Sequence, residues 1–345
     1  MIRFMHHSST PPGTAVSRLY VAPDVSHLLT LVLSTAHLSG FSDASSAKTS
    51  QPKKSVLDSV TFAANLREAG IHIEERQIES FYHELHRQCY PNLQDCARRS
   101  QDCAVDLSSD ERMRLKMLSF VSDAANDFVT TASAVRETTK GKSGKSIRLE
   151  IQLVDGESVE TIISIISSKG NPEGSVVVSS QVGSSVECVH PRSAKYVRDL
   201  SAAEIVEQVV HAARVLSGQM IAIRNVAFMG SGEPLHNYHS VLLACQFLEK
   251  VFRLKKGRIT ISTVGITPRI HDLRRDLPGV ILAIHLHAPT NELRQAILPG
   301  FKFGLVGLFE ALDQFMSKSE HDFCNERYEK LSRRRTVMIE YLMGK

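Results

Sequence analysis

Residues 225–235 read Asn-Val-Ala-Phe-Met-Gly-Ser-Gly-Glu-Pro-Leu, a short apolar run that ends in a glycine-rich turn. The run has the length and composition of a buried strand, and its glycines permit close approach of the backbone at the turn. A helical pattern follows at 239–252. A strand, a glycine-rich turn and a helix in this order predict one unit of an α/β protein with a parallel sheet.

The same alternation continues on both sides of this stretch. Strands are expected at 176–179, 258–263, 280–284 and 336–342, and helices at 201–217, 268–276 and 305–317. Ser201 and Glu204 have the spacing of a capping box at a helix start. The pattern predicts a parallel sheet, either open or closed into a barrel, with functional loops at the carboxyl ends of its strands.

The loops after these strands carry the candidate ligand-binding residues. They are Gly232, Glu233, Ser262, His285, Leu286 and His287. We expect Glu233 to be presented at the sheet edge, where its carboxylate can hold an ammonium group of a ligand. The two histidines share one face of an extended chain. Because the sequence shows no third metal ligand beside them, a ligand contact or packing is preferred to metal binding.

Three segments with other patterns precede the alternating region. Residues 1–54 are rich in serine and threonine and contain no acid before Asp24, which indicates a transit peptide or a disordered extension. Helical spacing of apolar residues predicts a helical domain at 55–138. Alternating apolar residues around an Asp-Gly turn predict a β-hairpin linker at 139–170. The barrel-like domain then occupies 171–345.

The composition is that of a globular protein of about two domains. Of the 345 residues, 42% are hydrophobic and 23% are charged, which excludes global disorder. The net charge of +4 permits an RNA partner without requiring one. Six cysteines are too few for a disulfide scaffold, and no apolar stretch is long enough to predict a membrane span. We expect a mitochondrial protein or, failing import, a cytoplasmic one.

Four ordered motifs together carry a family resemblance. They are Val178-Ser179-Ser180-Gln181-Val182-Gly183, the stretch 228–235, Ser262-Thr263-Val264-Gly265 and the stretch 286–294. In order and spacing they resemble the radical-SAM adenine-C2 methyltransferases that modify ribosomal and transfer RNA. The resemblance implies a helical domain, a β linker and a partial (β/α)6 barrel. It also implies a four-iron cluster that binds S-adenosylmethionine (SAM), with the cofactor pocket lined by the six candidate residues above.

The resemblance fails at the positions that carry the chemistry. The three cysteines that hold the family's cluster correspond to Ser184, Cys188 and Pro191, so only Cys188 is retained as a ligand. The methyl-accepting cysteine corresponds to Val177. Glu160 matches the family's acid–base glutamate, although extra residues separate it from Val177, and we expect it to be idle. The barrel is expected to be truncated after about its fifth strand, which would leave the strand at 336–342 as an exposed edge for a ribosomal or assembly-factor protein.

Two hypotheses of different classes follow. In the first, the chain is a degenerate, inactive relative that binds ribosomal or transfer RNA or assists ribosome assembly, with weak SAM binding and no 4Fe–4S cluster. In the second, it is a divergent or incompletely represented active methyltransferase. Basic residues that favour an RNA partner are Lys140, Lys142, Lys145, Arg148, Lys255, Lys256, Arg258 and Arg333–Arg335.

Overall fold

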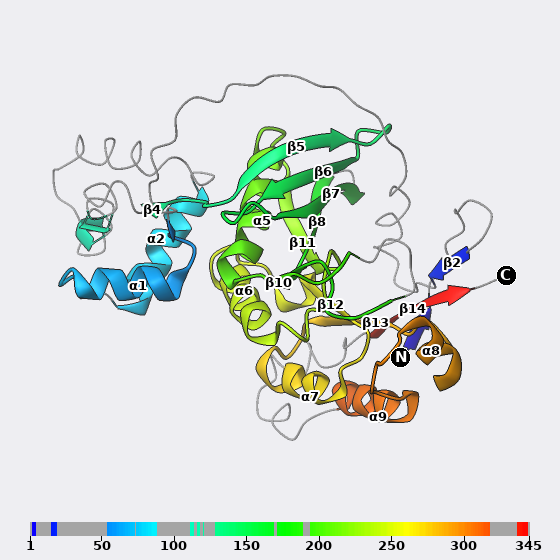
Figure 1. Cartoon of the computed structure of the whole chain (residues 1–345). Helices are drawn as coiled ribbons and strands as arrows, with labels where there is room; N and C mark the ends of the chain where they lie inside the picture. Colours follow the sequence, from blue (N-terminus) through cyan, green and yellow to red (C-terminus); the bar gives the residue numbers. More distant parts are fainter. Residues whose placement is uncertain are drawn as a thin grey trace.

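The structure is a computed structural model in which a mixed sheet runs through the centre of the molecule (Figure 1). It describes residues 2–4, 15–18, 54–72, 74–87, 111–113, 116–117, 120, 128–168, 171–188, 194–317 and 337–343. The expected positions Pro191 and Arg333–Arg335 lie outside these residues. Among the described helices, none has the length and apolar character needed to cross a membrane.

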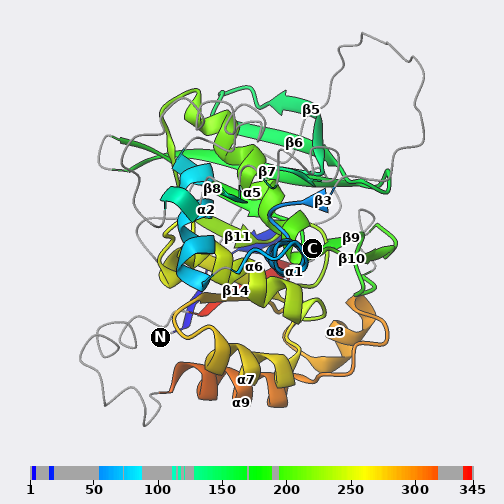
Figure 2. The same cartoon turned by 90° about the vertical axis from the view of Figure 1, so that its left-hand side faces the viewer.

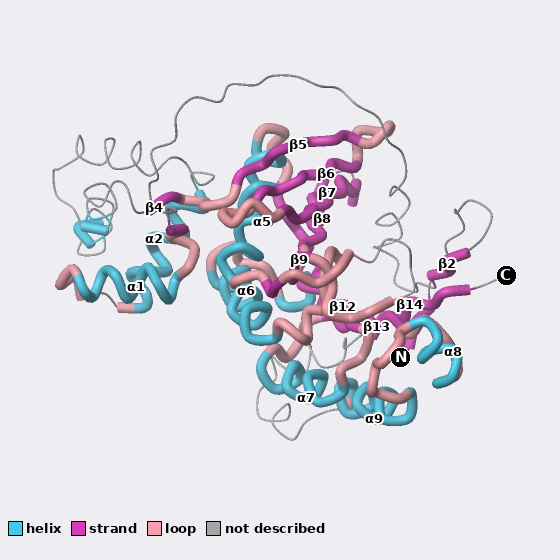
Figure 3. The backbone as a smooth tube through the Cα atoms, in the orientation of Figure 1, coloured by secondary structure: helices cyan, strands magenta, loops and turns pink. Residues whose placement is uncertain are grey.

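The predicted α/β class is confirmed by five parallel strands joined by helices (Figure 3). The strands are β8 (Asn171–Val178), β11 (Ala222–Phe228), β12 (Ile259–Thr263), β13 (Ile281–His285) and β14 (Val337–Met343). The helices are α5 (Ala202–Ser217), α6 (Tyr238–Lys250), α7 (Thr267–Asp276), α8 (Asn291–Ile297) and α9 (Leu305–Met316). The capping box of Ser201 and Glu204 is present at the start of α5. Helix α8 was not predicted.

The two faces of the parallel strands differ in chemistry. One face carries Val176, Val226, Ile261, Leu282 and Val337, all fully buried. Helix α5 packs against β8 and β11. The opposite face, called the inner face here, carries smaller or polar side chains at the paired positions, including Val177, Ala227, Thr260, Ser262 and Ala283. The apolar face supplies the core, which leaves the inner face to bear a site.

Three antiparallel strands extend the sheet beyond β8. They are β5 (Ala134–Lys140), β6 (Ser146–Gln152) and β7 (Ser158–Ser168). The predicted hairpin around Asp155-Gly156 is present as β6 and β7, and β5 adds a strand that starts before the expected boundary at 139. Every residue of β5 is exposed, whereas Ile147, Leu149 and Ile151 of β6 are buried. The outermost strand therefore faces solvent along its whole length.

A buried polar cluster fastens the start of this antiparallel sheet to α5. The Glu207 carboxylate accepts hydrogen bonds from the backbone N–H groups of Ala132 and Ser133 at 2.9 and 2.8 Å. The Ser133 hydroxyl donates to Glu207 and lies 3.1 Å from Nε2 of His211. Burial, with Arg214 as a further cause, lowers the pKa of His211 to about 4. Since the serine donates to the carboxylate, the cluster is a structural tie and not a nucleophile with its base.

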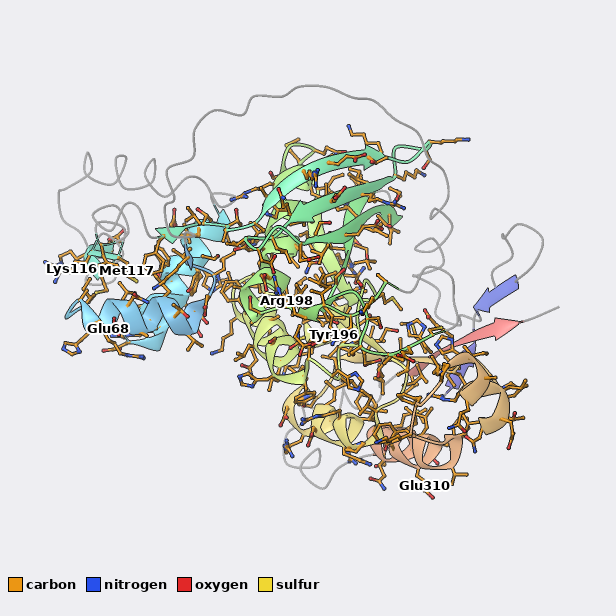
Figure 4. All side chains as sticks on the ribbon, viewed as in Figure 1. Glu68, Lys116, Met117, Tyr196, Arg198 and Glu310 are labelled. Carbon is orange, nitrogen blue, oxygen red and sulfur yellow. The ribbon has the colours of Figure 1, made fainter. Side chains whose placement is uncertain are left out.

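A second polar tie holds the β6–β7 turn to the start of α5. Arg198, in β10 (Arg198–Asp199), contacts Asp155 of the turn at 2.6 Å and Glu204 of α5 at 2.7 Å (Figure 4). Strand β10 pairs with β9 (Gln181–Val182), which follows β8. The hairpin turn and the loop after β8 are thus held at the same end of the sheet.

The predicted N-terminal helices are α1 (Ser59–Glu68) and α2 (Glu75–Arg87). At the start of this segment, β3 (Lys54–Ser55) pairs with β4 (Phe128–Val129). The Tyr82 ring lies 5.0 Å from that of Phe247 in α6, and Lys250 of α6 contacts Glu79 at 3.1 Å. Figure 2 shows α1 and α2 on the side of the molecule where α6 lies. The helical segment therefore docks on the barrel helix that follows the glycine-rich turn.

The expected exposed edge at β14 is wrong in this structure. Strand β14 pairs in parallel with β1 (Ile2–Phe4) and antiparallel with β2 (Ala15–Arg18). Backbone groups that would otherwise be unpaired are thus covered by the same chain. The remainder of the expected transit peptide or extension at 1–54 lies outside the described residues, except for Lys54.

Candidate functional site

The loops after β8 and β11 are organised around the Gln181 side chain. Its Oε1 accepts from the backbone N–H of Glu233 at 2.9 Å and from that of Ser185 at 3.1 Å. Its Nε2 donates to Asp199 at 2.6 Å. One buried amide therefore sets the positions of two neighbouring loops, a role that the sequence analysis missed because the partners are 52 residues apart.

The glycine-rich turn after β11 needs glycine for steric reasons. Gly232 has a φ of 98°, and a Cβ at this position would lie 2.5 Å from Cβ of Gln181. A Cβ on Gly230 would lie 2.8 Å from the backbone nitrogen of Ser179. The predicted close approach of the backbone is therefore present, and it is made to the neighbouring loop of the chain.

Glu233 lies inside the protein and not at an open edge. Its side chain is only 3% exposed, and its two carboxylate oxygens accept from the backbone N–H groups of Leu235 and Val264, both at 2.9 Å. Burial is the larger effect and raises the pKa of Glu233 above its usual value, although these hydrogen bonds offset part of the rise. Glu233 thus lies in the loop after β11 with both oxygens bonded to the main chain, and its contact with a ligand ammonium stays a prediction.

Ser262 has an unused hydroxyl on the inner face. It is 3% exposed, and its Oγ has no hydrogen-bond partner among the residues that the structure describes. The same holds for Oγ of Ser180 in the loop after β8. Buried hydroxyls normally have a partner, so both atoms fit a polar group of a bound molecule. The place of Ser262 in a SAM pocket stays a prediction.

His285 pairs with an acidic residue on the next strand. Its Nδ1 lies 2.5 Å from Oε2 of Glu340, and the two residues are aligned partners of β13 and β14. The ring of His287 stacks on that of His285 with 5.6 Å between centroids, and its backbone has a φ of 63°. The Leu286 amide donates to the backbone oxygen of Glu340 at 2.8 Å. The three predicted residues are thus brought together, with Glu340 as an addition that the sequence analysis missed.

Glu160 lies on the inner face despite the extra residues before β8. Val177 pairs with Ile162, and Glu160 precedes Ile162 by two residues on the same strand, which puts it on the same face. The Glu160 side chain is 45% exposed and contacts Nε of Arg148 at 3.3 Å. The family's acid–base and methyl-carrier positions therefore share one face, although no catalytic role of Glu160 is tested by this geometry.

The residues at the cluster positions do not fit a 4Fe–4S cluster. The Ser184 hydroxyl donates to the backbone oxygen of Val186 at 3.2 Å. Cys188 is partly buried and packs against the small apolar cluster of Val186, Val264 and Leu298. A single thiolate cannot provide the three ligands that such a cluster takes from cysteine.

The fold has a counterpart among solved structures. A radical SAM methyltransferase from Sphaerobacter thermophilus matches with a TM-score of 0.61, covering 84% of this chain and 75% of that one at 24% identity. At this identity the likeness concerns the fold alone. The fold is that of a radical SAM methyltransferase, with the candidate loops at the carboxyl ends of its parallel strands.

Sequence comparison finds relatives among RNA methyltransferases. The ribosomal RNA large subunit methyltransferase N of Nitrosopumilus maritimus is 37% identical over 163 residues, 45% of this chain and 46% of that protein. The dual-specificity RNA methyltransferase RlmN of Alcanivorax borkumensis is 34% identical over 236 residues, 66% of this chain and 56% of that protein. Over the matched residues the chain is therefore a homologue of RlmN-type RNA methyltransferases, which supports the family resemblance. It spans about half the length of the curated relatives it matches. No family model matches the chain.

Proposed function

We propose that this chain is a member of the RlmN-type family that binds RNA but does not carry out radical methyl transfer by itself, with a role on ribosomal or transfer RNA or in ribosome assembly. The observation that carries the proposal is the set of residues at the cluster positions, Ser184, Cys188 and Pro191. A serine hydroxyl is a hard donor with a high pKa, and proline has no side-chain donor. With Val177 at the methyl-carrier position, two separate requirements of the reaction are unmet.

A residual SAM pocket is part of the proposal. The unpartnered buried hydroxyls of Ser262, on the inner face, and of Ser180, in the loop after β8, support binding of a polar cofactor at this end of the sheet. The affinity should be weak, because the family's open iron would normally chelate the amino and carboxylate groups of SAM. Mitochondrial import also stays a proposal, supported by the acid-poor, serine- and threonine-rich first residues.

Basic residues at one end of the sheet, fully exposed in the β5–β6 turn, support RNA binding. Lys142 and Lys145 lie in the exposed turn between β5 and β6, next to Lys140 at the end of β5. The turn lies at the end of the sheet where β8 begins, because Ser146 pairs with Ser164 and Ser168 pairs with Asn171. The short helix η1 (Lys256–Arg258), which precedes β12, lies at the same end of the parallel strands. These cations can meet the phosphates of one RNA strand.

The proposal is tested by measuring the affinity for single-stranded ribosomal RNA fragments at several salt concentrations. Lys142→Gln combined with Lys145→Gln should weaken binding and flatten the log–log salt slope by about 1.4, if each lysine contacts one phosphate. The matched control combines Lys54→Gln with Arg67→Gln, which changes the net charge equally in the helical segment. Binding that is absent or independent of salt would overturn the proposal. SAM-dependent methylation of RNA by the isolated chain would instead favour the active methyltransferase.

A further inference from the structure

A cavity of about 130 Å³ lies where α8 meets the segment that leads into α9. Its lining includes Asn291, Arg294, Gln295, Phe301, Lys302 and Phe303. These residues belong neither to the six candidate cofactor positions nor to the basic residues of the β5–β6 turn and η1. The lining combines two cations, two amides and two aromatic rings.

Arg294 is a buried cation without a carboxylate among the described residues. It is 3% exposed, and burial lowers its pKa. One terminal nitrogen donates to the backbone oxygen of Val264 and the other to that of Leu286 at 3.5 Å, whereas Nε has no hydrogen-bond partner in the described structure. A buried charge is costly unless it is compensated. Since two carbonyl oxygens compensate it only in part, the cavity is suited to an anion.

Lys302 adds a second positive charge to the same cavity. Lys302 is exposed, and it forms no ion pair with a carboxylate among the residues that the structure describes. One buried and one exposed cation at a single cavity can contact a phosphate from two sides.

The aromatic lining indicates that the anion is part of a nucleotide. The Arg294 guanidinium lies over the Phe301 ring at 5.1 Å, and the Phe301 and Phe303 rings are 5.5 Å apart in an edge-on arrangement. Proteins that bind single-stranded nucleic acid combine cations for the backbone with aromatic rings for the bases. The amide of Gln295 adds groups that can bond to a base edge.

The cavity adjoins the loops of the candidate site. Through Val264 and Leu286, Arg294 contacts the loops that directly follow Ser262 at the end of β12 and His285 at the end of β13. Helix α8 directly follows β13 at the lower right of the molecule in Figure 1. A nucleotide held here would therefore lie at the carboxyl end of the strands, the end opposite to the basic turn between β5 and β6.

We propose that this cavity binds one unpaired nucleotide, with its phosphate at Arg294 and Lys302 and its base against Phe303. The inference rests on the proposed RNA-binding function and names a site for it. RNA would then make two kinds of contact. One is recognition of a nucleotide in this cavity, at the carboxyl end of the parallel strands. The other is general electrostatic contact with the basic turn between β5 and β6, at the opposite end.

The test is calorimetric titration of the full chain with adenosine monophosphate, adenosine and inorganic phosphate. Adenosine monophosphate should bind, and adenosine should bind at least about tenfold more weakly, because it lacks the charged group. Lys302→Gln should weaken the binding of adenosine monophosphate by about tenfold, whereas the control Lys54→Gln, at an exposed position outside both proposed binding surfaces, should leave it unchanged. Phe303→Leu should weaken it while leaving the binding of inorganic phosphate intact.

Equal binding of adenosine and adenosine monophosphate would overturn the phosphate contact. If inorganic phosphate binds as tightly as adenosine monophosphate, the claim that the cavity recognises a nucleotide and not phosphate alone is overturned. An unchanged Lys302→Gln protein would overturn the pocket, even if Arg294 variants fail to fold. If RNA binding responds to Lys142 and Lys145 but adenosine monophosphate does not bind, this inference fails and the proposed function stands. If the mononucleotide binds and RNA does not, the cavity is a nucleotide site and the proposed RNA-binding function fails.

Discussion

The Glu233 carboxylate accepts a hydrogen bond from the backbone N–H of Val264 at 2.9 Å, and this contact joins the loops after two neighbouring strands. Its other oxygen accepts from Leu235 in its own loop. Because the carboxylate is buried and serves main-chain donors, it has a structural function that does not depend on any bound cofactor. The presence of Glu233 in the chain therefore does not by itself indicate that a cofactor binds here.

Glu233→Ala should lower the free energy of unfolding by about 3 kcal/mol, since it leaves two buried backbone N–H groups without an acceptor. Glu233→Gln should cost less, because the amide oxygen can still accept one of the two bonds. Denaturant unfolding followed by circular dichroism measures both effects. Glu310→Ala, on the exposed face of α9 (Figure 4), is the control and should change stability by less than about 0.5 kcal/mol. A Glu233→Ala protein as stable as this control would contradict the assigned role.

Gly232→Ala should cost more than Gly144→Ala, although both glycines have a positive φ. A Cβ at Gly232 would collide with Gln181, whereas nothing lies within 4 Å of a Cβ at Gly144. We expect about 1 kcal/mol for Gly144→Ala from backbone strain alone and at least about 3 kcal/mol for Gly232→Ala, which adds a steric conflict. Thermal and denaturant unfolding compare the two variants. Equal losses would mean that the close approach of the two loops does not occur.

Stability should decrease as the pH falls from about 6.5 to about 4, in part through His211. Its pKa is lowered to about 4 in the folded protein, so in this window the unfolded state binds a proton that the folded state does not. The contribution is fully present above pH 6.5, and its loss reaches about 3 kcal/mol by pH 4. His211→Gln should therefore have a smaller loss of stability between pH 7 and pH 4.5, measured by urea unfolding. His239→Gln, at an exposed position in α6, is the matched control. An identical pH dependence for His211→Gln and the unaltered protein would contradict this account.

Cys188→Val should preserve both the fold and RNA affinity, because the thiol packs against Val186, Val264 and Leu298. A volume-conserving apolar replacement in such a cluster usually costs less than about 1.5 kcal/mol. Thermal unfolding and RNA titration at constant salt check the two expectations. Loss of RNA binding in a folded Cys188→Val protein would assign the thiol a chemical role.

The order of strands and helices could be predicted because local patterns determine it. The strand at 225–229 ends in glycines that mark its turn, and the capping box at Ser201 marks the start of α5. Helix α8 was missed because its seven residues are too few for a clear helical period. The pairing of β1 and β2 with β14 was missed because strands more than 300 residues apart leave no local signal.

The candidate site could be predicted as a set of loops but not as a set of contacts. The positions Gly232, Ser262 and His285 follow from the strand ends, and the structure places them at one end of the sheet. The burial of Glu233 and its bond to Val264 depend on how two loops pack, which no single segment encodes. The Arg294 cavity depends in the same way on contacts between α8 and two separate loops.

The central claim, that this chain does not carry the cluster on which radical methyl transfer depends, is tested most directly by anaerobic reconstitution of the full chain with iron and sulfide. Bound iron per chain, measured after removal of the excess, is the readout. The account predicts far less than one iron per chain and no absorption typical of an iron–sulfur cluster. About four irons per chain, lost when Cys188 is changed to alanine, would contradict it and identify an active cluster site.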